Sequence, residues 1–244
     1  MTGAARSFDA IAGTYARARP GYPPAAIDWL LPATAARVLD LGAGTGKLTA
    51  LLLDRGLQVT AVEPSPQMLA ELERELGARA GLRAQAGSAE TIPLADGSVD
   101  AVLVAQAWHW VDPLRAVPEV ARVLVPGGRL GLLWNRRDES EPWAAELSRI
   151  LEQPEPRTHA GRPALGAPFE AVERFDTPRW LEEMTPAKLL EMISTRSCVI
   201  IAEPAERARM LQGVRALLDE HPDLAGRERF GMPYITECVR ATRA

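Results

Sequence analysis

Hydrophobic and polar positions follow two different periods along the first two thirds of the chain. Short apolar runs bounded by turn residues are typical of buried strands, and apolar residues that recur every three or four positions are typical of amphipathic helices. Strands are expected near residues 36–41, 58–62, 82–86, 99–105 and 129–134, and helices near 46–55, 66–76 and 113–123. This alternation predicts βαβ units and a mostly parallel sheet.

The pattern changes toward both ends of the chain. Residues 8–31 are amphipathic, with Pro23 and Pro24 opening an apolar helical stripe, and we expect them to cover the ligand cleft. Residues 153–168 are rich in Pro, Gly, Arg and Ala, which favours a loop. Beyond the loop we expect a strand near 170–178, helices near 186–195 and 203–219, and a final strand near 230–241.

The first expected strand ends in a glycine-rich turn that opens a helix. Residues 38–49 read VLDLGAGTGKLT. Gly42, Gly44 and Gly46 permit positive φ angles and can present backbone N–H groups to a ligand that lies across the strand end. The turn therefore predicts a small-molecule site, although a tight strand-to-helix connection without a ligand is the alternative.

The spacing around the turn departs from two nucleotide motifs. A dinucleotide fingerprint needs Gly-x-Gly-x-x-Gly, and Lys47 stands where its third glycine belongs. A phosphate-binding P-loop needs Ser or Thr after Gly-Lys, where this chain has Leu48. The turn therefore fits neither motif.

An acidic residue ends the second expected strand. Glu63 is followed by Pro64, Ser65 and Pro66. In a doubly wound sheet, an acidic residue at this strand end reaches ribose hydroxyls of the ligand. Ser65 is expected to cap the next helix, with Pro66 in its first turn. A solvated charge at a strand end is the alternative interpretation of Glu63.

These motifs resemble those of the class I S-adenosylmethionine-dependent methyltransferases of the small-molecule type (methyltransferase type 11 domain). The resemblance covers residues 8–135 and is carried by VLDLGAGTGKLT, AVEPSPQML, the segment 87–112 and LVPGGRLGLLWN. The segments FDAIAGTYARARPGYP and AQAWHWVD are most similar to the branch with trans-aconitate methyltransferase-like and quinone-biosynthesis-like enzymes. The resemblance implies a Rossmann-like, doubly wound α/β fold. Its mostly parallel seven-stranded sheet would have an antiparallel last strand and a helical lid insertion.

The resemblance also implies a site for S-adenosyl-L-methionine. Asp40 would organise the glycine turn or meet the amino group of the methionine part, and Glu63 would accept hydrogen bonds from both ribose hydroxyls. The residues expected to bind the cofactor are Tyr15, Arg19, Asp40, Gly42, Ala43, Gly44, Gly46, Glu63, Pro64, Met68, Ser88, Ala89 and Gln106.

Several of these residues have a structural alternative. The Ser88 hydroxyl and the Ala89 N–H are expected to recognise adenine, but a polar strand-end loop explains both residues as well. Met68 would cover the adenine face or belong to the core. Tyr15 and Arg19 would close over the cofactor, with Arg19 meeting its carboxylate, or Arg19 is a helix-surface charge.

The fourth expected strand ends near the reacting groups, because ligands bind at the carboxyl ends of parallel strands. Gln106, Trp108 and His109 are expected to border the methyl group and the acceptor, with Trp134 and Asn135 as further wall residues. His109 is the candidate general base, since imidazole titrates near neutral pH, or it is an aromatic wall residue.

Charged residues follow the fifth expected strand. Arg136 and Arg137 would recognise an acidic acceptor, although the adjacent Asp138, Glu139 and Glu141 favour a salt-bridged surface. No metal is expected, because the fourth strand end lacks an acidic ligand. The Asn/Asp-Pro-Pro-Tyr/Phe and Pro-Cys motifs of nucleic-acid methylation are absent as well.

Methyl transfer from a sulfonium is an in-line displacement that positioning can promote, so a dedicated catalytic residue is optional. The expected acceptor is a small organic molecule such as a carboxylate or a phenol- or quinone-like compound. An NAD(P)-dependent oxidoreductase shares the strand, glycine turn and distal acid, and only Lys47 argues against it. A non-catalytic cofactor-binding protein is also compatible with these motifs.

Composition narrows the class of protein. With 244 residues, 47% hydrophobic and 25% charged, one domain is expected over 1–244, divided into a cover (1–32), a cofactor-binding core (33–152) and C-terminal strands with lid helices (153–244). The net charge of −4 argues against nucleic acid. Cys198 and Cys238 suit a reducing compartment. No signal peptide or membrane-length apolar run is evident, so a cytoplasmic protein is expected. We expect a monomer or a homodimer.

Overall fold

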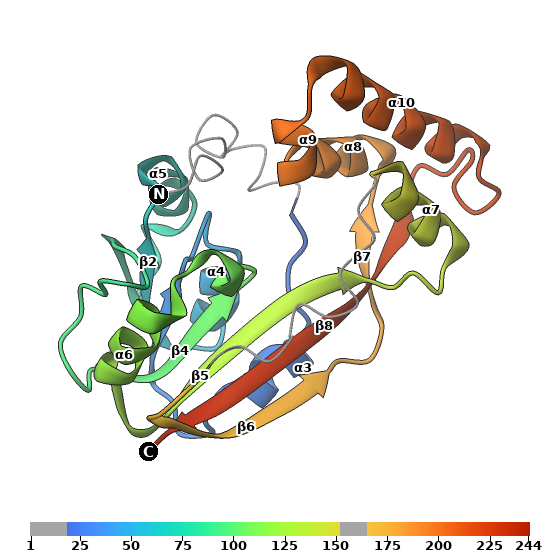
Figure 1. Ribbon diagram of the computed structural model, residues 1–244. Helices are drawn as coiled ribbons and strands as arrows, with labels where there is room; N and C mark the ends of the chain where they lie inside the picture. The colour runs from blue at the N-terminus through green and yellow to red at the C-terminus, as the bar shows by residue number, and fades with distance from the viewer. Residues whose placement is uncertain (1–18, 152–164) are drawn as a thin grey trace. The chain divides into compact units, whose positions relative to one another are not determined.

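The computed structural model describes residues 19–151 and 165–244 (Figure 1). The described residues form two compact units. We call residues 22–135, 165–177 and 236–244 the sheet unit, and residues 19–21, 136–151 and 178–235 the helical unit. The predicted division of the chain at residues 33 and 153 stays a prediction.

A mostly parallel sheet forms the framework of the fold, with the strand order β3-β2-β1-β4-β5-β8-β6. β1 lies between β2 and β4 with parallel pairing, and β2–β3 and β4–β5 are parallel as well. β8 is antiparallel to β6. The strands on this path are β1 (Arg37–Leu41), β2 (Gln58–Glu63), β3 (Leu82–Ala86), β4 (Val99–Ala105), β5 (Leu124–Arg137), β6 (Phe169–Asp176) and β8 (Phe230–Arg243). This path confirms the predicted doubly wound α/β fold with its antiparallel last strand. The predicted count of seven strands is wrong, because β7 (Trp180–Met184) pairs with β8 as an eighth strand of the sheet in the described part of the chain.

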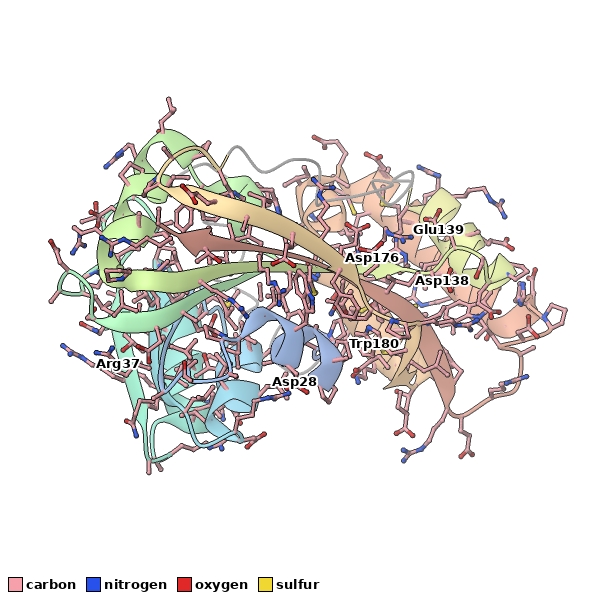
Figure 2. The ribbon with its side chains drawn as sticks, turned by 90° about the horizontal axis from the view of Figure 1, so that it is seen from below. Asp28, Arg37, Asp138, Glu139, Asp176 and Trp180 are labelled. Carbon is pink, nitrogen blue, oxygen red and sulfur yellow. The ribbon has the colours of Figure 1, made fainter. Side chains whose placement is uncertain are left out.

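Helices cover both faces of the sheet unit, because successive side chains of a strand point to opposite faces. On β1, Val38 packs in a cluster with α3 and α4, whereas Leu39 packs in a cluster with α6. Figure 2 labels Asp28 on α3, whose carboxylate pairs with Arg55 at 2.9 Å. The helices of this unit are α3 (Pro24–Leu30), α4 (Lys47–Leu53), α5 (Pro66–Leu76) and α6 (Pro113–Val123), with the short 3₁₀ turn η2 (Trp108–Trp110).

Local signals set the helix boundaries as the sequence predicted. The Ser65 hydroxyl accepts a hydrogen bond from the Met68 N–H at 3.2 Å, and Pro66 opens α5. The carboxylate of Asp112 caps α6 by accepting from the Leu114 N–H at 3.0 Å. β5 begins earlier than predicted, since the Pro-Gly-Gly segment 126–128 lies within an irregular part of the strand.

The helical unit has its own core. Tyr234 and Phe230 pack there with Met192 and Val214, and the rings of Trp143 and Phe230 meet edge to face at 5.6 Å. Its elements are α7 (Pro142–Ile150), β7 (Trp180–Met184), α8 (Pro186–Ser194), α9 (Ser197–Ile201) and α10 (Pro204–Glu220), with β7 antiparallel to β8. The predicted helices at 186–195 and 203–219 are confirmed. α7, α9 and β7 were not predicted.

Candidate functional site

The glycine turn follows β1 and adopts the backbone conformation that its sequence predicted. The φ angles of Gly42, Gly44 and Gly46 are +72°, +57° and +87°. Residues with a side chain rarely adopt such angles, because the Cβ atom clashes with the backbone. The turn therefore depends on glycine at all three positions.

The backbone N–H groups of the turn point into the protein, and the expectation that those of Gly42, Gly44 and Gly46 face the ligand is wrong. The Gly46 N–H donates to the carbonyl of Ala43 at 3.0 Å. The N–H groups of Gly42 and Ala43 both donate to the carbonyl of Val62, at 2.8 and 3.1 Å. The Gly44 N–H donates to Glu63 Oε2 at 2.8 Å. These bonds tie the turn to the end of β2, so the turn serves a ligand through its shape.

The three glycines have different surroundings. A Cβ atom on Gly46 would lie 2.7 Å from Leu76 Cδ1 and 3.0 Å from Leu72 Cγ, so this glycine lets α5 pack closely. A Cβ atom on Gly44 would meet nothing within 4 Å. Gly44 is therefore where the turn leaves room for a ligand to approach the backbone.

Glu63 joins the turn to the next loop. Its side chain is buried, and its two carboxylate oxygens accept from the N–H groups of Gly44 at 2.8 Å and Ser65 at 2.9 Å. A carboxylate oxygen can accept more than one hydrogen bond, so these two bonds do not by themselves prevent a ligand hydroxyl from binding. The arrangement fits the predicted contact with ribose and also makes Glu63 an organiser of the turn.

Asp40 lies at the end of β1 with only 1% of its surface exposed. Its Oδ2 accepts from the Thr49 hydroxyl at 2.6 Å, but its Oδ1 has no hydrogen-bond partner among the described residues. Burial raises the pKa of Asp40 to about 7; the Thr49 hydrogen bond opposes this rise, and the charge of Glu63 adds to it. The Asp40 carboxyl is therefore suited to a cationic group.

Thr45 and Thr49 belong to the site although the sequence interpretation did not select them. The Thr45 hydroxyl is buried and lacks a hydrogen-bond partner within residues 19–151 and 165–244. Buried polar groups in proteins are nearly always satisfied, so this hydroxyl and Asp40 Oδ1 are candidate contacts for a bound molecule. The sequence signal that identifies Thr45 and Thr49 is a hydroxyl side chain within the turn motif itself.

The end of β4 lies beside the glycine turn. A Cβ atom on Gly42 would be 3.0 Å from Ala107 Cβ. The preceding residue, Gln106, has a φ of +58°, and its N–H donates to the carbonyl of Leu133 at 2.9 Å. Strained backbone at a non-glycine residue is common where a ligand binds. The structure thus brings the residue after Gln106 against the turn, and the contact of Gln106 with a ligand stays a prediction.

The expected acceptor residues divide into buried and exposed groups. Trp108 and Trp134 are buried in one hydrophobic cluster, and Asn135 is buried, accepting from the Thr236 hydroxyl at 2.8 Å. His109 is exposed, and its ring lies 4.8 Å from that of Trp110. The roles of these residues at the acceptor stay predictions. The Trp134 Nε1 atom is buried without a hydrogen-bond partner among the described residues, so it has a free donor.

The expected adenine segment follows β3. The Ser88 hydroxyl and the Asp112 N–H hold the pKa of the Glu90 carboxyl below its ordinary value, although burial acts in the opposite direction. Ala89 is buried in the core. The polar strand-end loop is therefore present, and the contact with adenine stays a prediction.

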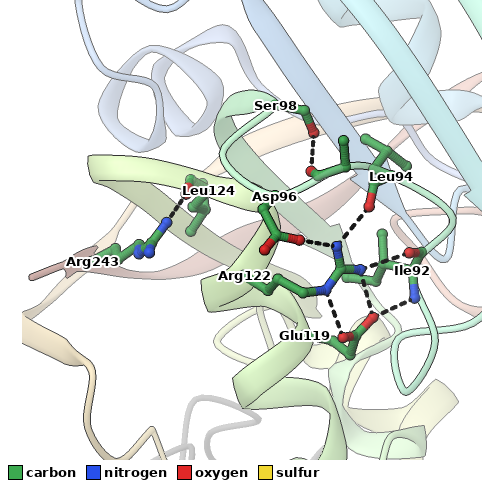
Figure 3. Close-up of polar contacts among 9 residues, drawn as sticks. Ile92, Leu94, Asp96, Ser98, Glu119, Arg122, Leu124 and Arg243 are labelled. Carbon is green, nitrogen blue, oxygen red and sulfur yellow. Dashed lines mark hydrogen bonds and ion pairs between the residues drawn. The ribbon is translucent and has the colours of Figure 1, made fainter.

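The segment beyond Ser88 is fixed to α6 by an arginine cluster (Figure 3). Arg122 donates to Glu119 through Nε and Nη2, to Asp96 at 2.8 Å, and to the carbonyls of Ile92 and Leu94 at 2.9 and 2.7 Å. Glu119 in turn accepts from the Ile92 N–H at 2.9 Å. This cluster holds the loop between β3 and β4 in place.

The remaining expected cofactor residues lie in varied surroundings. Tyr15 lies outside the described residues. Arg19 belongs to the helical unit, where its Nη2 donates to the carbonyl of Thr195 at 3.0 Å. Met68 is buried and Pro64 is exposed at the start of α5. Their contacts with a cofactor stay predictions.

The expectation of a salt-bridged surface at Arg137 is wrong. The Arg137 side chain is fully buried, and its Nε and Nη2 donate to the Ser148 hydroxyl at 3.3 and 3.0 Å. Asp138, labelled in Figure 2, and Glu141 pair with Arg179 at 3.7 and 2.5 Å. The acidic residues are neutralised by an arginine distant in sequence, which local spacing does not reveal.

None of the helices in the described part of the chain has the length and apolar composition needed to cross a membrane.

Comparisons with known proteins agree with this geometry. Residues 39–132 match the family model described as a methyltransferase domain. The chain is similar to a Mycobacterium tuberculosis protein described as a methyltransferase, with 53% identity over 98% of this chain and 96% of that protein. It is also similar to the malonyl-[acyl-carrier protein] O-methyltransferase of Enterobacter lignolyticus, with 35% identity over 67% of this chain and 68% of that protein. A solved structure from Anaeromyxobacter dehalogenans, described as a type II methyltransferase, has a TM-score of 0.67 and 26% identity, and the match covers 92% of this chain and 97% of that one.

Proposed function

This chain belongs to the family of S-adenosylmethionine-dependent methyltransferases, and we propose that it transfers a methyl group from S-adenosylmethionine to a small organic acceptor. The single observation that carries the proposal is the pair of acidic residues flanking the glycine turn. Asp40 has a buried oxygen with no partner among the described residues, and Glu63 anchors the turn with both of its carboxylate oxygens. A molecule with a cationic part and a sugar diol suits both.

The residues of the sheet unit bind and orient the cofactor in this proposal. Asp40 meets the positively charged methionine part, Glu63 accepts from the ribose hydroxyls, and Gly44 leaves room beside the backbone. S-adenosylmethionine supplies an activated methyl group on a sulfonium. Because the leaving group is already activated, the protein's main task is to hold donor and acceptor in line and exclude water.

We place the acceptor at the end of β4, beside the turn. Gln106 is held there in a strained conformation, and His109 follows on the exposed side. A carboxylate acceptor is favoured by the similarity to the Enterobacter lignolyticus protein, whose name assigns methyl transfer to an oxygen of a malonyl group. A phenol- or quinone-like acceptor is the second candidate. The transferring step needs no base for a carboxylate, whereas a phenol needs one, for which His109 is positioned at the surface.

The proposal also concerns the setting of the enzyme. We propose a cytoplasmic protein, monomeric or homodimeric, whose partner is a small molecule and not a nucleic acid. The acidic balance of 28 Lys and Arg against 32 Asp and Glu supports this, because nucleic-acid sites are basic.

A thermal-shift experiment tests the choice of cofactor. We expect S-adenosylmethionine and S-adenosylhomocysteine to raise the Tm of the full chain, since a ligand that binds only the native state stabilises it. NADH is the matched control for the oxidoreductase alternative. A rise with NADH and none with either adenosyl compound would contradict the proposal.

A screen of acceptors separates an enzyme from a non-catalytic binder. The full chain is incubated with methyl-labelled S-adenosylmethionine and either small dicarboxylic acids or small phenols, and labelled product is measured. We expect transfer to the acids. Transfer to phenols that is lost in His109→Ala supports the second candidate, whereas no transfer to any acceptor despite cofactor binding favours the binder.

A further inference from the structure

The sheet unit buries Asp40 without a complete set of partners. Its Oδ2 is engaged by Thr49 at 2.6 Å, and its Oδ1 has no hydrogen-bond partner in the described part of the chain. Burying an ionised carboxylate is costly unless a cation or several donors compensate for the lost water. In the free protein, Asp40 therefore has a physical reason to hold a proton.

The elements packed around Asp40 reinforce this tendency. Across the sheet, Asp40 pairs with Ala61 on β2 and Leu103 on β4, and neither carries charge. Glu63 at the end of β2 is the nearby anion, and its repulsion raises the pKa of Asp40. On α4, Thr49 supplies a hydroxyl and a backbone N–H that lower this pKa, and Lys47 is the charged residue of that helix. Burial outweighs the lowering.

Resting on the proposed function, we propose that Asp40 holds a proton in the free protein at slightly acidic pH and releases it to solvent when the cationic cofactor binds. The resulting carboxylate compensates the positive charge of the donor. Methyl transfer converts the sulfonium to a neutral thioether and leaves the amino group charged, so the attraction to the carboxylate weakens in part and Asp40 regains a fraction of a proton from solvent. Asp40 is thereby a specificity-determining residue that favours donor over product by charge.

Thr49 acts as a positioning residue in the proposed proton release from Asp40. Its hydroxyl donates to Oδ2 and stabilises the ionised form, which directs the remaining oxygen, Oδ1, toward the proton or the ligand. In Thr49→Val the ionised form loses this donor, so proton release moves to higher pH. Thr49→Ser keeps a hydroxyl and restores the wild-type pH range.

Affinity for the donor depends on pH in a defined way. Where Asp40 is protonated in the free protein and ionised in the complex, binding strengthens by up to about tenfold for each unit of rising pH. The dependence ends above the pKa of about 7. In Asp40→Asn this contribution is absent at every pH.

Isothermal titration calorimetry with the full chain tests the inference. S-adenosylmethionine and S-adenosylhomocysteine are each titrated at about pH 6, in two buffers with different heats of protonation, which gives the protons released per ligand bound. We expect close to one additional proton for wild type compared with Asp40→Asn, and fewer with S-adenosylhomocysteine. Asp100→Asn, a matched change of a half-buried aspartate at the other end of the sheet, keeps the wild-type value.

The outcomes separate this inference from the proposed function. Tight binding with equal proton release in wild type and Asp40→Asn overturns the inference and leaves the function intact. No binding of either adenosyl compound overturns both. If Asp40→Asn does not fold, Thr49→Val decides, because an unchanged pH profile of its affinity contradicts the coupling, whereas a shift to higher pH that Thr49→Ser reverses supports it.

Discussion

Asp100 and Asp40 lie at opposite ends of the neighbouring strands β4 and β1. Asp100 contributes to stability, and Asp40 is the residue we propose for binding. At the amino end of β4, Asp100 accepts from the N–H groups of Ala36 and Arg37 at 3.0 and 2.8 Å and pairs with the Arg37 guanidinium at 2.7 Å (Arg37 in Figure 2). Burial there acts against ionisation, but these partners hold the pKa of Asp100 below its ordinary value. At the carboxyl end of β1, Asp40 is buried with one oxygen unpartnered and a raised pKa.

The difference shows at which end of a parallel sheet a buried hydrogen-bond acceptor is left without a partner. Asp100 is complete within the protein, so its role ends with holding strands β1 and β4 together. Asp40 has one oxygen without a partner among the described residues, and in our proposal a proton or a bound cation compensates for it. Ligands bind at the carboxyl ends of parallel strands for this reason as well as for topology. The predictions below test this division.

The largest expected effect concerns stability and pH at Asp40. Between 3.8, the ordinary value, and about 7, the folded protein binds a proton at Asp40 that the unfolded chain has lost. The free energy of unfolding therefore falls as pH rises through this window, by up to about 1.4 kcal/mol per unit. Asp40→Asn removes this fall. The free energy of unfolding of the variant therefore increases relative to that of wild type between pH 4 and 8. Urea unfolding at several pH values measures the free energy of unfolding of both proteins. The same pH dependence in the two proteins would contradict the account.

The second effect concerns the glycines of the turn. Gly46→Ala places a methyl group 2.7 Å from Leu76 in a strained conformation, so we expect a loss of about 3 kcal/mol in unfolding free energy. The matched variant Gly44→Ala has open space and should lose only about 1 kcal/mol, from backbone strain. Its affinity for S-adenosylmethionine should nevertheless fall. Equal stability losses in the two variants would show that packing of α5 is not what requires Gly46.

Glu63→Gln tests the binding role of the carboxyl end of β2. The amide keeps the size of the side chain but loses one acceptor and the charge, and hydrogen bonds to charged groups contribute about 1.5–3 kcal/mol. We expect the Kd for S-adenosylmethionine to rise by roughly 10- to 100-fold. Calorimetry measures it, with Asp100→Asn as the control that keeps wild-type affinity.

Arg122→Gln tests a charge cluster that serves stability. The variant loses several hydrogen bonds to Glu119, Asp96 and the 92–94 backbone, so we expect a loss of about 1–3 kcal/mol. Affinity for the cofactor should stay within about twofold of wild type, an energy near RT and too small for a lost ligand contact. A tenfold weaker affinity would assign the cluster a part in positioning the adenine segment.

The smallest effect is expected at the amino end. The Arg37 side chain is half exposed, and ion pairs with an exposed partner contribute little. Asp100→Asn should lower the Tm by less than about 4 °C and leave binding unchanged. A larger decrease in Tm would mean that the contacts of Asp100 stabilise more of the protein than the pairing of β1 with β4.

Local signals predicted much of the cofactor side of the molecule. The strand, the positive φ angles of the turn, Ser65 as a cap and Glu63 at a strand end all follow from short-range chemistry, and the structure has them. The direction of the turn's N–H groups did not follow, because their acceptor, the carbonyl of Val62, lies on another strand. The unpartnered state of Asp40 likewise depends on how the whole sheet packs.

Nonlocal packing explains the failures elsewhere. Arg137 has acidic neighbours in sequence, yet β5 carries it into the interior, and the pattern of charges alone does not show this. Trp108 is buried in the cluster that includes residues of α6, a placement that its position in the sequence does not reveal, and its role at the acceptor stays a prediction. β7 was missed because Trp180–Met184 is short and contains two glutamates, which are uncommon in strands.

The central claim is that the carboxyl ends of β1 and β2 form a site for S-adenosylmethionine organised by Glu63. Titration of this ligand into wild type and Glu63→Gln, side by side in a calorimeter, tests it most directly. The account predicts one site per chain in wild type and binding at least about tenfold weaker in the variant, as the loss of a hydrogen bond to a charged group implies. Equal affinities in the two proteins, or no heat of binding in wild type, would contradict it.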